Sequence, residues 1–347
     1  MTSKRYLGNI ITDTPTAPAG PYSSDVASGV WSLAEQRTYS AAGLWPTAGN
    51  VNPANLGLYL SSTNAGNPST YGSQIRSFGF SSLGSSSDFG DTLSSYLKLT
   101  AAVASTTRAV FGGGFESSTF SNVLQYVTLL SAGNSTDFGD LTVGRYTNNG
   151  AHSNSTRGIF AGGNISGGRT NVIDYITIAS TGNATDFGDL SNTMTTSGTG
   201  SSTRAIWAGG FSSSQETNEI QYVTIASTGN ASNFGSLLGG SRQGVGACSS
   251  ATRAVMAGGY STGAGAFNNI EYVTIASTGN TTDFGDLSSS ETGANCASTS
   301  NGTIGVYLYS TFENSITIAS TGNGTAFSDS GVVHQTTATS GGHGGLQ

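Results

Sequence analysis

The sequence predicts an all-β fold of six repeats with four short strands each, a pattern typical of a six-bladed β-propeller. The first observation is a motif of arginine, a short apolar run and a glycine pair, which starts at Arg108, Arg157, Arg204 and Arg253. The spacings of 49, 47 and 49 residues indicate an array of supersecondary units. The second observation is the motif DFGD or a variant of it, which extends the period to both ends of the array through Phe89, Phe138, Phe187, Phe234, Phe284 and Phe327.

Within a repeat, the strands follow from the local sequence in chain order. A loose Ser/Thr/Gly segment such as 149–155 is predicted as the first strand, and the apolar run RAIWA (204–208) as the second. The β-branched segment IQYVTIA (220–226) is predicted as the third strand, and FGDL begins the fourth. The sequence STGN between them is predicted as a turn, because Gly and Asn tolerate positive φ. No stretch of ten or more residues in the repeats has helical periodicity.

The glycine pair is followed in three repeats by an aromatic residue, Phe115, Phe211 or Tyr260. A glycine pair at the end of a strand followed by an aromatic residue resembles the repeat of kelch-type β-propellers, over residues 57 to about 340. The tryptophan that usually follows the kelch tyrosine is absent, and the Phe of DFGD is expected in its place. The resemblance implies a kelch-like six-bladed propeller, in which the glycines allow close approach of neighbouring backbones.

The terminal repeats predict how the ring closes. The first repeat starts with its second strand at Gly57, and a spare segment, GVVHQTT (331–337), follows the sixth repeat. We expect 331–337 to pair with the strand that starts at Gly57, which completes the first blade and removes open edges. The predicted organisation is an N-terminal attachment segment over 1–54 and a propeller over 55–347, closed by its C-terminal strand.

Residues 1–54 do not repeat and carry two of the three tryptophans, in SGVWSLAEQ (28–36) and AGLWPT (42–47). This pairing is similar to the N-terminal segment of many tail-fibre and virion proteins of bacteriophages, which often continue into repeats ending in TIASTGNATDFGDL. The resemblance implies an extracellular protein of the virion tail and a homo-oligomer. It also implies that the N-terminal segment attaches to other virion proteins.

Composition excludes several classes of function. The net charge of −7 and the presence of only two lysines argue against a nucleic-acid partner, because phosphate binding needs clustered Lys and Arg. No run of 18 apolar residues exists, so we expect no membrane insertion. The first 18 residues lack the apolar core of a secretory signal, so we expect none. Cys248 and Cys296 are predicted to be free thiols on the inner strands of successive units.

No motif indicates a catalytic centre or a cofactor. His152 and Cys248 are expected at the central channel, but the matching residues Val103 and Thr199 are poor ligands, so we interpret both as buried and inert. The repeated aspartates of DFGD supply too few oxygens for calcium. Glu and His are scarce, so we expect no enzymatic activity, although two carboxylates that meet in space would suit a glycosidase. The repeated arginines are interpreted as structural, each paired with a DFGD aspartate or with turn carbonyls between blades.

The repeats differ from one another after the glycine pair and after FGDL, whereas the turn ASTGN is nearly the same in every unit. Both variable segments fall on one rim of the propeller, and binding residues are commonly placed on loops of a rigid scaffold. Phe115, Phe211 and Tyr260 are assigned to packing, because they hold a fixed place after the glycines. Since aromatic residues and arginine dominate binding hot spots, the predicted ligand-binding residues on this rim are Phe120, Arg145, Tyr146, Arg169, Arg242 and Phe267.

Together with the variable rim, the resemblance to phage proteins implies a phage virion protein, a tail fibre or adhesin whose propeller binds a host-surface glycan or protein without catalysis. A second interpretation is a purely structural tail adaptor or head decoration protein. A third is a secreted carbohydrate-active propeller enzyme.

Overall fold

The computed structural model describes residues 32–42, 53–61, 74–94, 100–116, 118–147, 149–290, 296–309, 312–328 and 337–346. The chain divides into two compact units, Met1–Asn52 and Pro53–Gln347. In the first unit, helix α1 (Leu33–Ala41) begins with a capping box, in which Ser32 Oγ accepts from the Glu35 N–H and the Glu35 carboxylate accepts from the Ser32 N–H. The two tryptophans of the predicted attachment segment lie outside the described residues.

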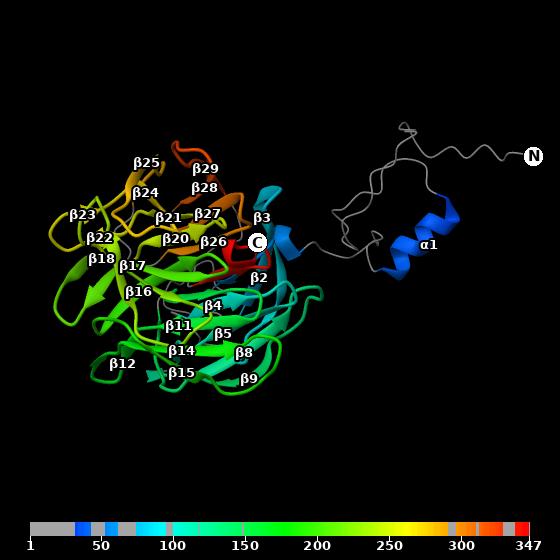
Figure 1. Cartoon of the computed structure of the whole chain (residues 1–347), viewed down its shortest axis with the longest axis horizontal. Coiled ribbons are helices and arrows are strands. Elements are labelled where there is room, and N and C mark those ends of the chain that lie inside the picture. Colours follow the sequence, from blue (N-terminus) through cyan, green and yellow to red (C-terminus); the bar gives the residue numbers. More distant parts are fainter. Residues whose placement is uncertain are drawn as a thin grey trace, which may run out of the picture. The chain divides into compact units, whose positions relative to one another are not determined.

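The second unit is a six-bladed β-propeller of four-stranded antiparallel sheets, as predicted (Figure 1). From the central channel outward, blade 1 consists of β30 (Ala338–Ser340), β1 (Leu56–Ser61), β2 (Gln74–Gly79) and β3 (Ser82–Asp91). Blade 2 consists of β4 (Ala101–Ala104), β5 (Arg108–Gly112), β8 (Val123–Thr128) and β9 (Thr136–Asp140). Blade 3 consists of β10 (Ala151–Ser153), β11 (Arg157–Ala161), β14 (Val172–Thr177) and β15 (Thr185–Asp189).

The remaining three blades have the same order. Blade 4 consists of β16 (Met194–Gly200), β17 (Arg204–Ser212), β18 (Glu216–Thr224) and β19 (Ser232–Ser236). Blade 5 consists of β20 (Gly246–Ser249), β21 (Arg253–Ala257), β24 (Asn269–Thr274) and β25 (Thr282–Asp286). Blade 6 consists of β26 (Ala297–Ser300), β27 (Ile304–Leu308), β28 (Glu313–Thr317) and β29 (Thr325–Phe327). The six inner strands contact one another in a ring, in the order β4, β10, β16, β20, β26, β30.

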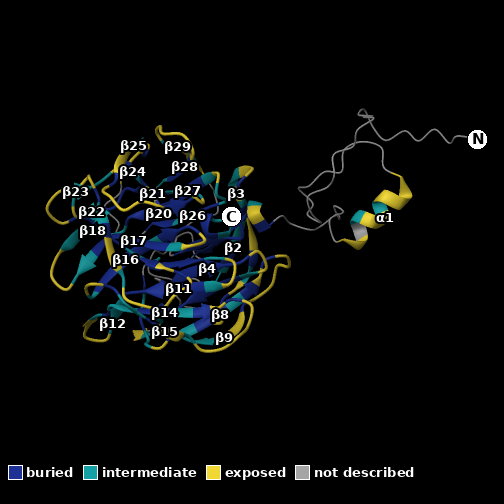
Figure 2. Ribbon diagram, in the orientation of Figure 1, coloured by how far each residue is buried: buried dark blue, intermediate teal, exposed yellow. Residues whose placement is uncertain are grey.

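The hydrophobic core lies between consecutive blades. Each buried cluster joins the face of one blade to the face of the next, as where Leu124 and Phe138 of blade 2 meet Phe160 and Ile176 of blade 3. Burial is therefore greatest along the inner strands and falls toward the outer turns (Figure 2). The tyrosine of the third strand and the Phe of DFGD pack edge to face, with ring centroids 5.9 Å apart for Tyr126 and Phe138.

The ring closes through a C-terminal strand that lies slightly later in the chain than predicted. Strand β30 pairs with β1 in the register Gly57↔Ser340, Leu58↔Thr339 and Tyr59↔Ala338. Of the predicted segment 331–337, only Thr337 is described, and its carbonyl accepts from the Leu60 N–H. After β30, the 3-10 helix η2 (Gly344–Leu346) contacts the inner strands β10, β16 and β20.

The two faces of the propeller carry different connections. The turn face carries the turns between first and second strands and those between third and fourth strands, the latter at 129–135, 178–184, 225–231, 275–281 and 318–324. The variable face carries the connections between second and third strands, at 113–116, 118–122, 162–171, 213–215 and 258–268. It also carries the connections between blades, at 141–147, 190–193 and 237–245.

On the turn face, each repeat arginine fastens its own blade to the next. Arg157 lies over the ring of Tyr175 at 4.4 Å and donates to the Ile225 carbonyl of blade 4 at 2.6 Å. The same bond joins Arg108 to Ile178 and Ala179, Arg204 to Ile275, and Arg253 to Ile318. Of the two predicted partners, the turn carbonyls are therefore correct, and among the described residues no repeat arginine forms an ion pair with a DFGD aspartate.

The asparagine of each STGN turn forms a second contact between blades, a hydrogen bond back to the preceding blade. Asn183 of blade 3 accepts from the Asp140 N–H of blade 2 at 3.1 Å through its side-chain oxygen. Asn134, Asn230, Asn280 and Asn323 do the same for Asp91, Asp189, Ser236 and Asp286. The near identity of ASTGN and DFGD from one repeat to the next is explained by this joint between blades.

Candidate functional site

The glycine pair shapes the variable face by letting one blade approach the next. Gly162 and Gly163 have φ values of 62° and 117°, which side chains rarely adopt. A Cβ on Gly162 would collide with the Met194 carbonyl, and one on Gly163 with the Tyr146 carbonyl. Each pair therefore turns the chain out of the second strand and against the connection that leads into the next blade.

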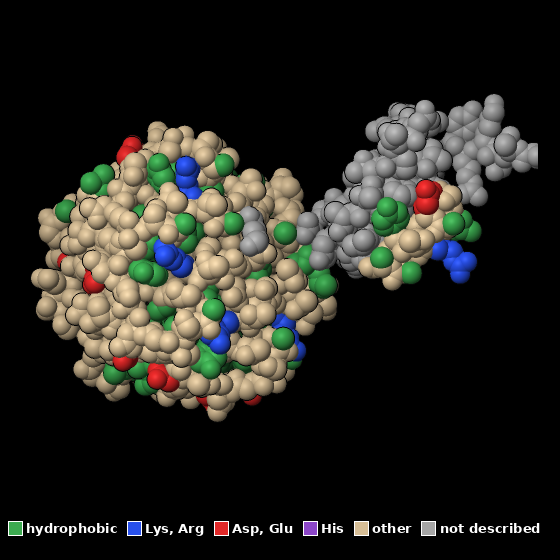
Figure 3. All heavy atoms as spheres, viewed as in Figure 1, with side chains coloured by type: hydrophobic (Ala, Val, Ile, Leu, Met, Phe, Trp, Pro, Cys, Tyr) green, Lys and Arg blue, Asp and Glu red, His purple; other side chains and the backbone are tan. Residues whose placement is uncertain are grey.

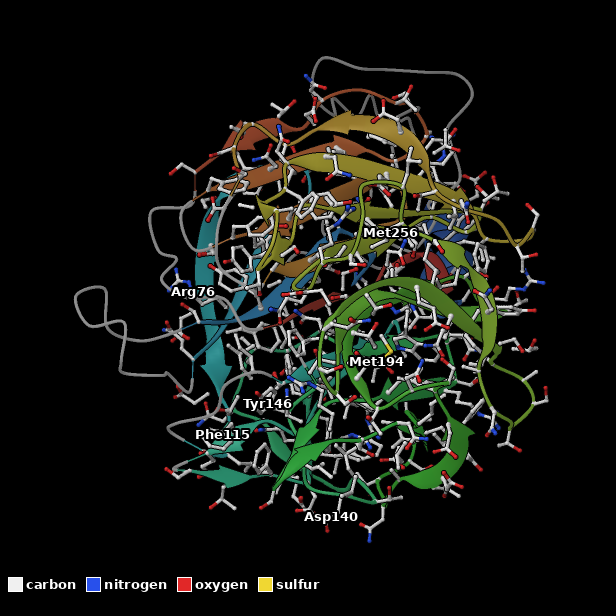
Figure 4. The ribbon with its side chains drawn as sticks, turned by 90° about the vertical axis from the view of Figure 1, so that its left-hand side faces the viewer. Arg76, Phe115, Asp140, Tyr146, Met194 and Met256 are labelled. Carbon is white, nitrogen blue, oxygen red and sulfur yellow. The ribbon has the colours of Figure 1, made fainter. Side chains whose placement is uncertain are left out.

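The first cluster on the variable face consists of three partly exposed aromatic rings. Phe115 and Phe120 are opposite each other in the small hairpin β6 (Phe115–Glu116) and β7 (Thr119–Phe120). Tyr146, on the connection between blades 2 and 3, stacks on Phe120 at 5.7 Å and meets Phe115 edge to face at 6.1 Å. Figure 4 shows Phe115 and Tyr146 beside each other on this face.

The second cluster continues from the first across blade 3. Tyr146 pairs through its backbone with Asn164 of β12 (Asn164–Ile165), and Asn164 pairs with Arg169 of β13 (Gly168–Arg169). The Arg169 guanidinium lies 4.4 Å from the ring centre of Phe211, which lies near the end of β17 in blade 4. Phe120, Tyr146 and Arg169 are thus brought together in one row, as partly exposed side chains.

The third cluster lies at blade 5. Phe267 is partly exposed after the hairpin of β22 (Tyr260–Ser261) and β23 (Gly265–Ala266), and the Arg242 guanidinium lies 5.1 Å from the centre of its ring. Tyr260 pairs through its backbone with Gln243. The face therefore presents a separate aromatic group at blade 5.

Two of the predicted binding residues, Arg145 and Arg242, are not available at the surface. The Arg145 side chain is buried and pairs with Asp174 at 2.8 Å, and that of Arg242 is buried and pairs with Glu271 at 3.1 Å. Burial lowers the pKa of Arg145, but the adjacent Asp174 carboxylate opposes that change. These two side chains therefore do not offer the exposed surface that the prediction assumed, because their guanidinium groups neutralise carboxylates beneath the face.

The reason lies in a repeated polar position just before the third-strand tyrosine. The side chain there accepts from a backbone N–H of the connection above it, as Gln221 does from Ser191 at 2.8 Å. In blades 3 and 5 the position holds an acid, Asp174 or Glu271, instead of an amide. Burial acts to raise the pKa of Glu271, yet the charge of Arg242 and hydrogen bonds from Thr281 and Gly239 lower it overall. Only these two blades have an arginine in the preceding connection among the described residues, so an acid at this position is the sequence signal for a buried arginine.

Two residues of the face were missed by sequence reasoning. Phe115 and Phe211 occupy the fixed place after the glycines, but both remain partly exposed and both contact a predicted residue. The contact of Phe115 with Phe120 would have followed from placing their hairpin in register, whereas the contact of Phe211 with Arg169 joins two different blades. The fixed position thus serves packing and surface chemistry at once.

The central channel is too narrow to hold a sugar. The cavity that remains in it has a volume of about 40 Å³, lined by His152, Cys248 and His343 among small side chains. A volume of this size suits one or two water molecules. The predicted positions of His152 and Cys248 at the channel are confirmed.

The histidines in the channel are held neutral. Burial lowers the pKa of His152 to about 3 and that of His343 to about 4. His343 Nε2 lies 3.1 Å from the Ala104 carbonyl and its Nδ1 accepts from the Gly345 N–H, so the C-terminal segment is bonded to the inner strands. Cys248 and Cys296 are buried free thiols, as predicted, and burial raises the pKa of Cys248 to about 12.

In the part of the chain that the structure describes, no three His, Cys, Asp or Glu side chains gather as a metal site would require. The same part contains no helix with the length and apolar character to cross a membrane. The face of the molecule in Figure 3 is mostly uncharged, with arginines in small separate patches. Comparison with protein-family models finds no match, and comparison with curated protein sequences also finds none.

Proposed function

We propose that the propeller is a binding module of a phage virion protein, a tail fibre or adhesin, and that its variable face binds a host-surface glycan without cleaving it. The observation that carries the proposal is the contrast between the two faces. The turn face repeats the same contacts from blade 2 to blade 6, whereas the variable face presents a different hairpin on each of blades 2 to 5. Differences confined to one face of a rigid scaffold are typical of a ligand surface.

The chemistry of the face supports a glycan. Its partly exposed aromatic rings, Phe120, Tyr146, Phe211 and Phe267, offer apolar surfaces bordered by polar Ser, Thr and Asn side chains. Aromatic rings contribute large contact areas at low conformational cost, and polar neighbours supply hydrogen bonds. Phe120, Tyr146, Arg169 and Phe267 are kept from the predicted set, and Phe115 and Phe211 are added.

The virion assignment rests on the resemblance of the N-terminal segment and the repeats to phage tail-fibre and virion proteins. The described propeller begins at Pro53–Asn55, where Asn55 bonds to Ser81 in the outer hairpin turn of blade 1. The chain therefore joins the propeller on the turn face. Attachment of the N-terminal segment to other virion proteins would leave the variable face for the host.

The test is adsorption of the fluorescently labelled full chain to a panel of intact bacterial cells. Tyr146→Ala and Phe267→Ala should each lower adsorption at least about tenfold, because hot-spot truncations cost roughly 2 kcal/mol or more. Thr228→Ala, in an exposed STGN turn, is the matched control and should adsorb like the parent. Thermal melting of each variant establishes that it is folded.

Unchanged adsorption by both face variants would reject the variable face as the binding surface. A structural tail or head component would then be the better account. Release of reducing sugar from the bound cells would instead reject binding without cleavage.

A further inference from the structure

We infer that Arg169, Tyr146 and Phe211 form a subsite for the carboxylate of an acidic sugar, which deepens the proposed function and rests on it. Arg169 is a partly exposed arginine of the variable face. The other two arginines described there, Arg145 and Arg242, form buried ion pairs with Asp174 and Glu271. The Arg169 side chain forms no ion pair or hydrogen bond with any described residue, and its Nε is buried without a partner.

The Arg169 guanidinium is held in place without being neutralised. It stacks on Phe211 at 4.4 Å, and its backbone is fixed opposite Asn164 in the small hairpin. Stacking leaves the edge of the guanidinium plane available, and that edge matches a carboxylate through two parallel hydrogen bonds. An arginine that is positioned but unpaired is therefore suited to a planar anionic group.

Two acidic groups of the same face, Glu216 and Glu219, are hydrogen-bonded to other residues. Glu216, opposite Phe211 in the β17–β18 hairpin, accepts from the backbone and hydroxyl of Thr262 on blade 5 at 3.1 and 2.7 Å. Those hydrogen bonds lower the pKa of Glu216, so it stays ionised while facing blade 5. Glu219 accepts from Ser191 at 3.1 Å.

Tyr146 supplies the neighbouring surface for the sugar. Burial raises the pKa of its phenol, and the charge of Arg169 acts in the opposite direction, which places the two groups within electrostatic reach. The phenol therefore remains protonated at neutral pH and can donate a hydrogen bond. A sugar ring against the Phe120 and Tyr146 rings would bring its carboxylate toward Arg169.

The charge of the whole protein makes this inference specific. The net charge is −7, so general attraction of polyanions is not expected, and acidic ligands must be recognised locally. Binding of an acidic glycan should then depend on one arginine. Binding through a broad basic patch would show no such dependence on a single residue.

The test uses the full chain on a printed array of uronate, sialate, sulfated and uncharged glycans. Acidic-sugar glycans should be the strongest ligands, and polygalacturonate, neutral galactan and sulfated galactan then give a matched titration by biolayer interferometry. Arg169→Ala should weaken binding of the best carboxylate glycan at least about tenfold, and Arg169→Lys should restore only part of it. Arg37→Ala, in exposed helix α1, removes the same charge and should have no effect.

Equal binding by Arg169→Ala would overturn the subsite, as would sulfated glycans that bind as tightly as carboxylates. Binding of uncharged glycans alone would also overturn it while leaving the proposed function standing. If Arg169→Ala adsorbs to cells like the parent but Tyr146→Ala and Phe267→Ala do not, only the carboxylate inference fails. If none of the three affects adsorption, the proposed function itself fails.

Discussion

The four joints that connect blades 2 to 6 in sequence differ from the joint between blades 6 and 1 in their side-chain contacts on the turn face. At each of the four joints from blade 2 to blade 6, an arginine donates to a carbonyl of the next blade and an STGN asparagine returns a bond. In blade 6, Ile304 stands in the place of the arginine and Ser315 in the place of the tyrosine beneath it. Blade 1 has a short hairpin turn at Phe80 and Ser81 instead of STGN.

A cavity lies at the joint between blades 6 and 1, where the arginine and tyrosine of the other joints are absent. Its volume is about 230 Å³, and it is lined by Ile304 and Ser315 of blade 6 and by Leu83 of blade 1, among others. Closure at this end of the array depends on the backbone ladder between β30 and β1 inside blade 1. The comparison shows that arginine and asparagine side chains reinforce the interior joints on the turn face, whereas the joint between blades 6 and 1 relies on its buried hydrophobic cluster and main-chain pairing joins the ends of the chain.

The largest effect is expected from removing that ladder. Ending the chain at Ser330 deletes β30 and the segment that contacts the channel, which leaves β1 as an open edge. We expect the melting temperature to fall by about 10 °C or more, because several kcal/mol of pairing and burial are lost. Differential scanning calorimetry measures the change.

A second truncation, after Gly341, keeps β30 and removes only the segment after it. It should lie between the parent and the shorter chain in melting temperature. A chain ending at Ser330 that melts like the parent would contradict main-chain closure.

A smaller effect is expected from breaking one interior joint. Arg157→Ala removes the stacking on Tyr175 and the bond to the Ile225 carbonyl, and should cost about 1–2 kcal/mol of unfolding free energy. Chemical denaturation measures this cost, and adsorption should not change once the variant is folded. Loss of adsorption without loss of stability would show that this arginine serves binding instead.

The smallest effect is expected from adding the fastening where it is absent. The double substitution Ile304→Arg with Ser315→Tyr introduces the arginine and the ring of the interior joints into the cavity of blade 6. It should raise unfolding free energy by about 0.5–1 kcal/mol. Ile304→Arg alone is the control and should give no gain, since the guanidinium would lack its ring; a gain equal to that of the pair would contradict the stacking.

The repeat pattern was sufficient to predict the fold, because its period, strand patterns and glycine pairs all agree with one architecture. The pairing of β1 with a C-terminal strand followed from counting strands. The position of that strand, at 338–340 instead of 331–337, did not follow, since Ser/Thr/Gly segments carry little register information.

The candidate site was predicted less completely, for a physical reason. Arg145 and Arg169 both lie in variable segments, and nothing in their own neighbourhoods distinguishes them. Their environments differ because a buried acid, Asp174, lies 29 residues from Arg145, whereas no acid pairs with Arg169 among the described residues. The difference therefore depends on contacts between distant residues, which local composition does not show.

The pairing of Gly57 with Ser340 also has a kinetic consequence. These partners lie at opposite ends of the array, so blade 1 can be completed only after all the intervening chain has been synthesised and brought into place. Contacts of such long sequence separation form slowly. Until they form, β1 exposes an unpaired edge, which favours strand exchange between two molecules of the same chain. Folding at high protein concentration should therefore compete with domain-swapped dimers joined through β30.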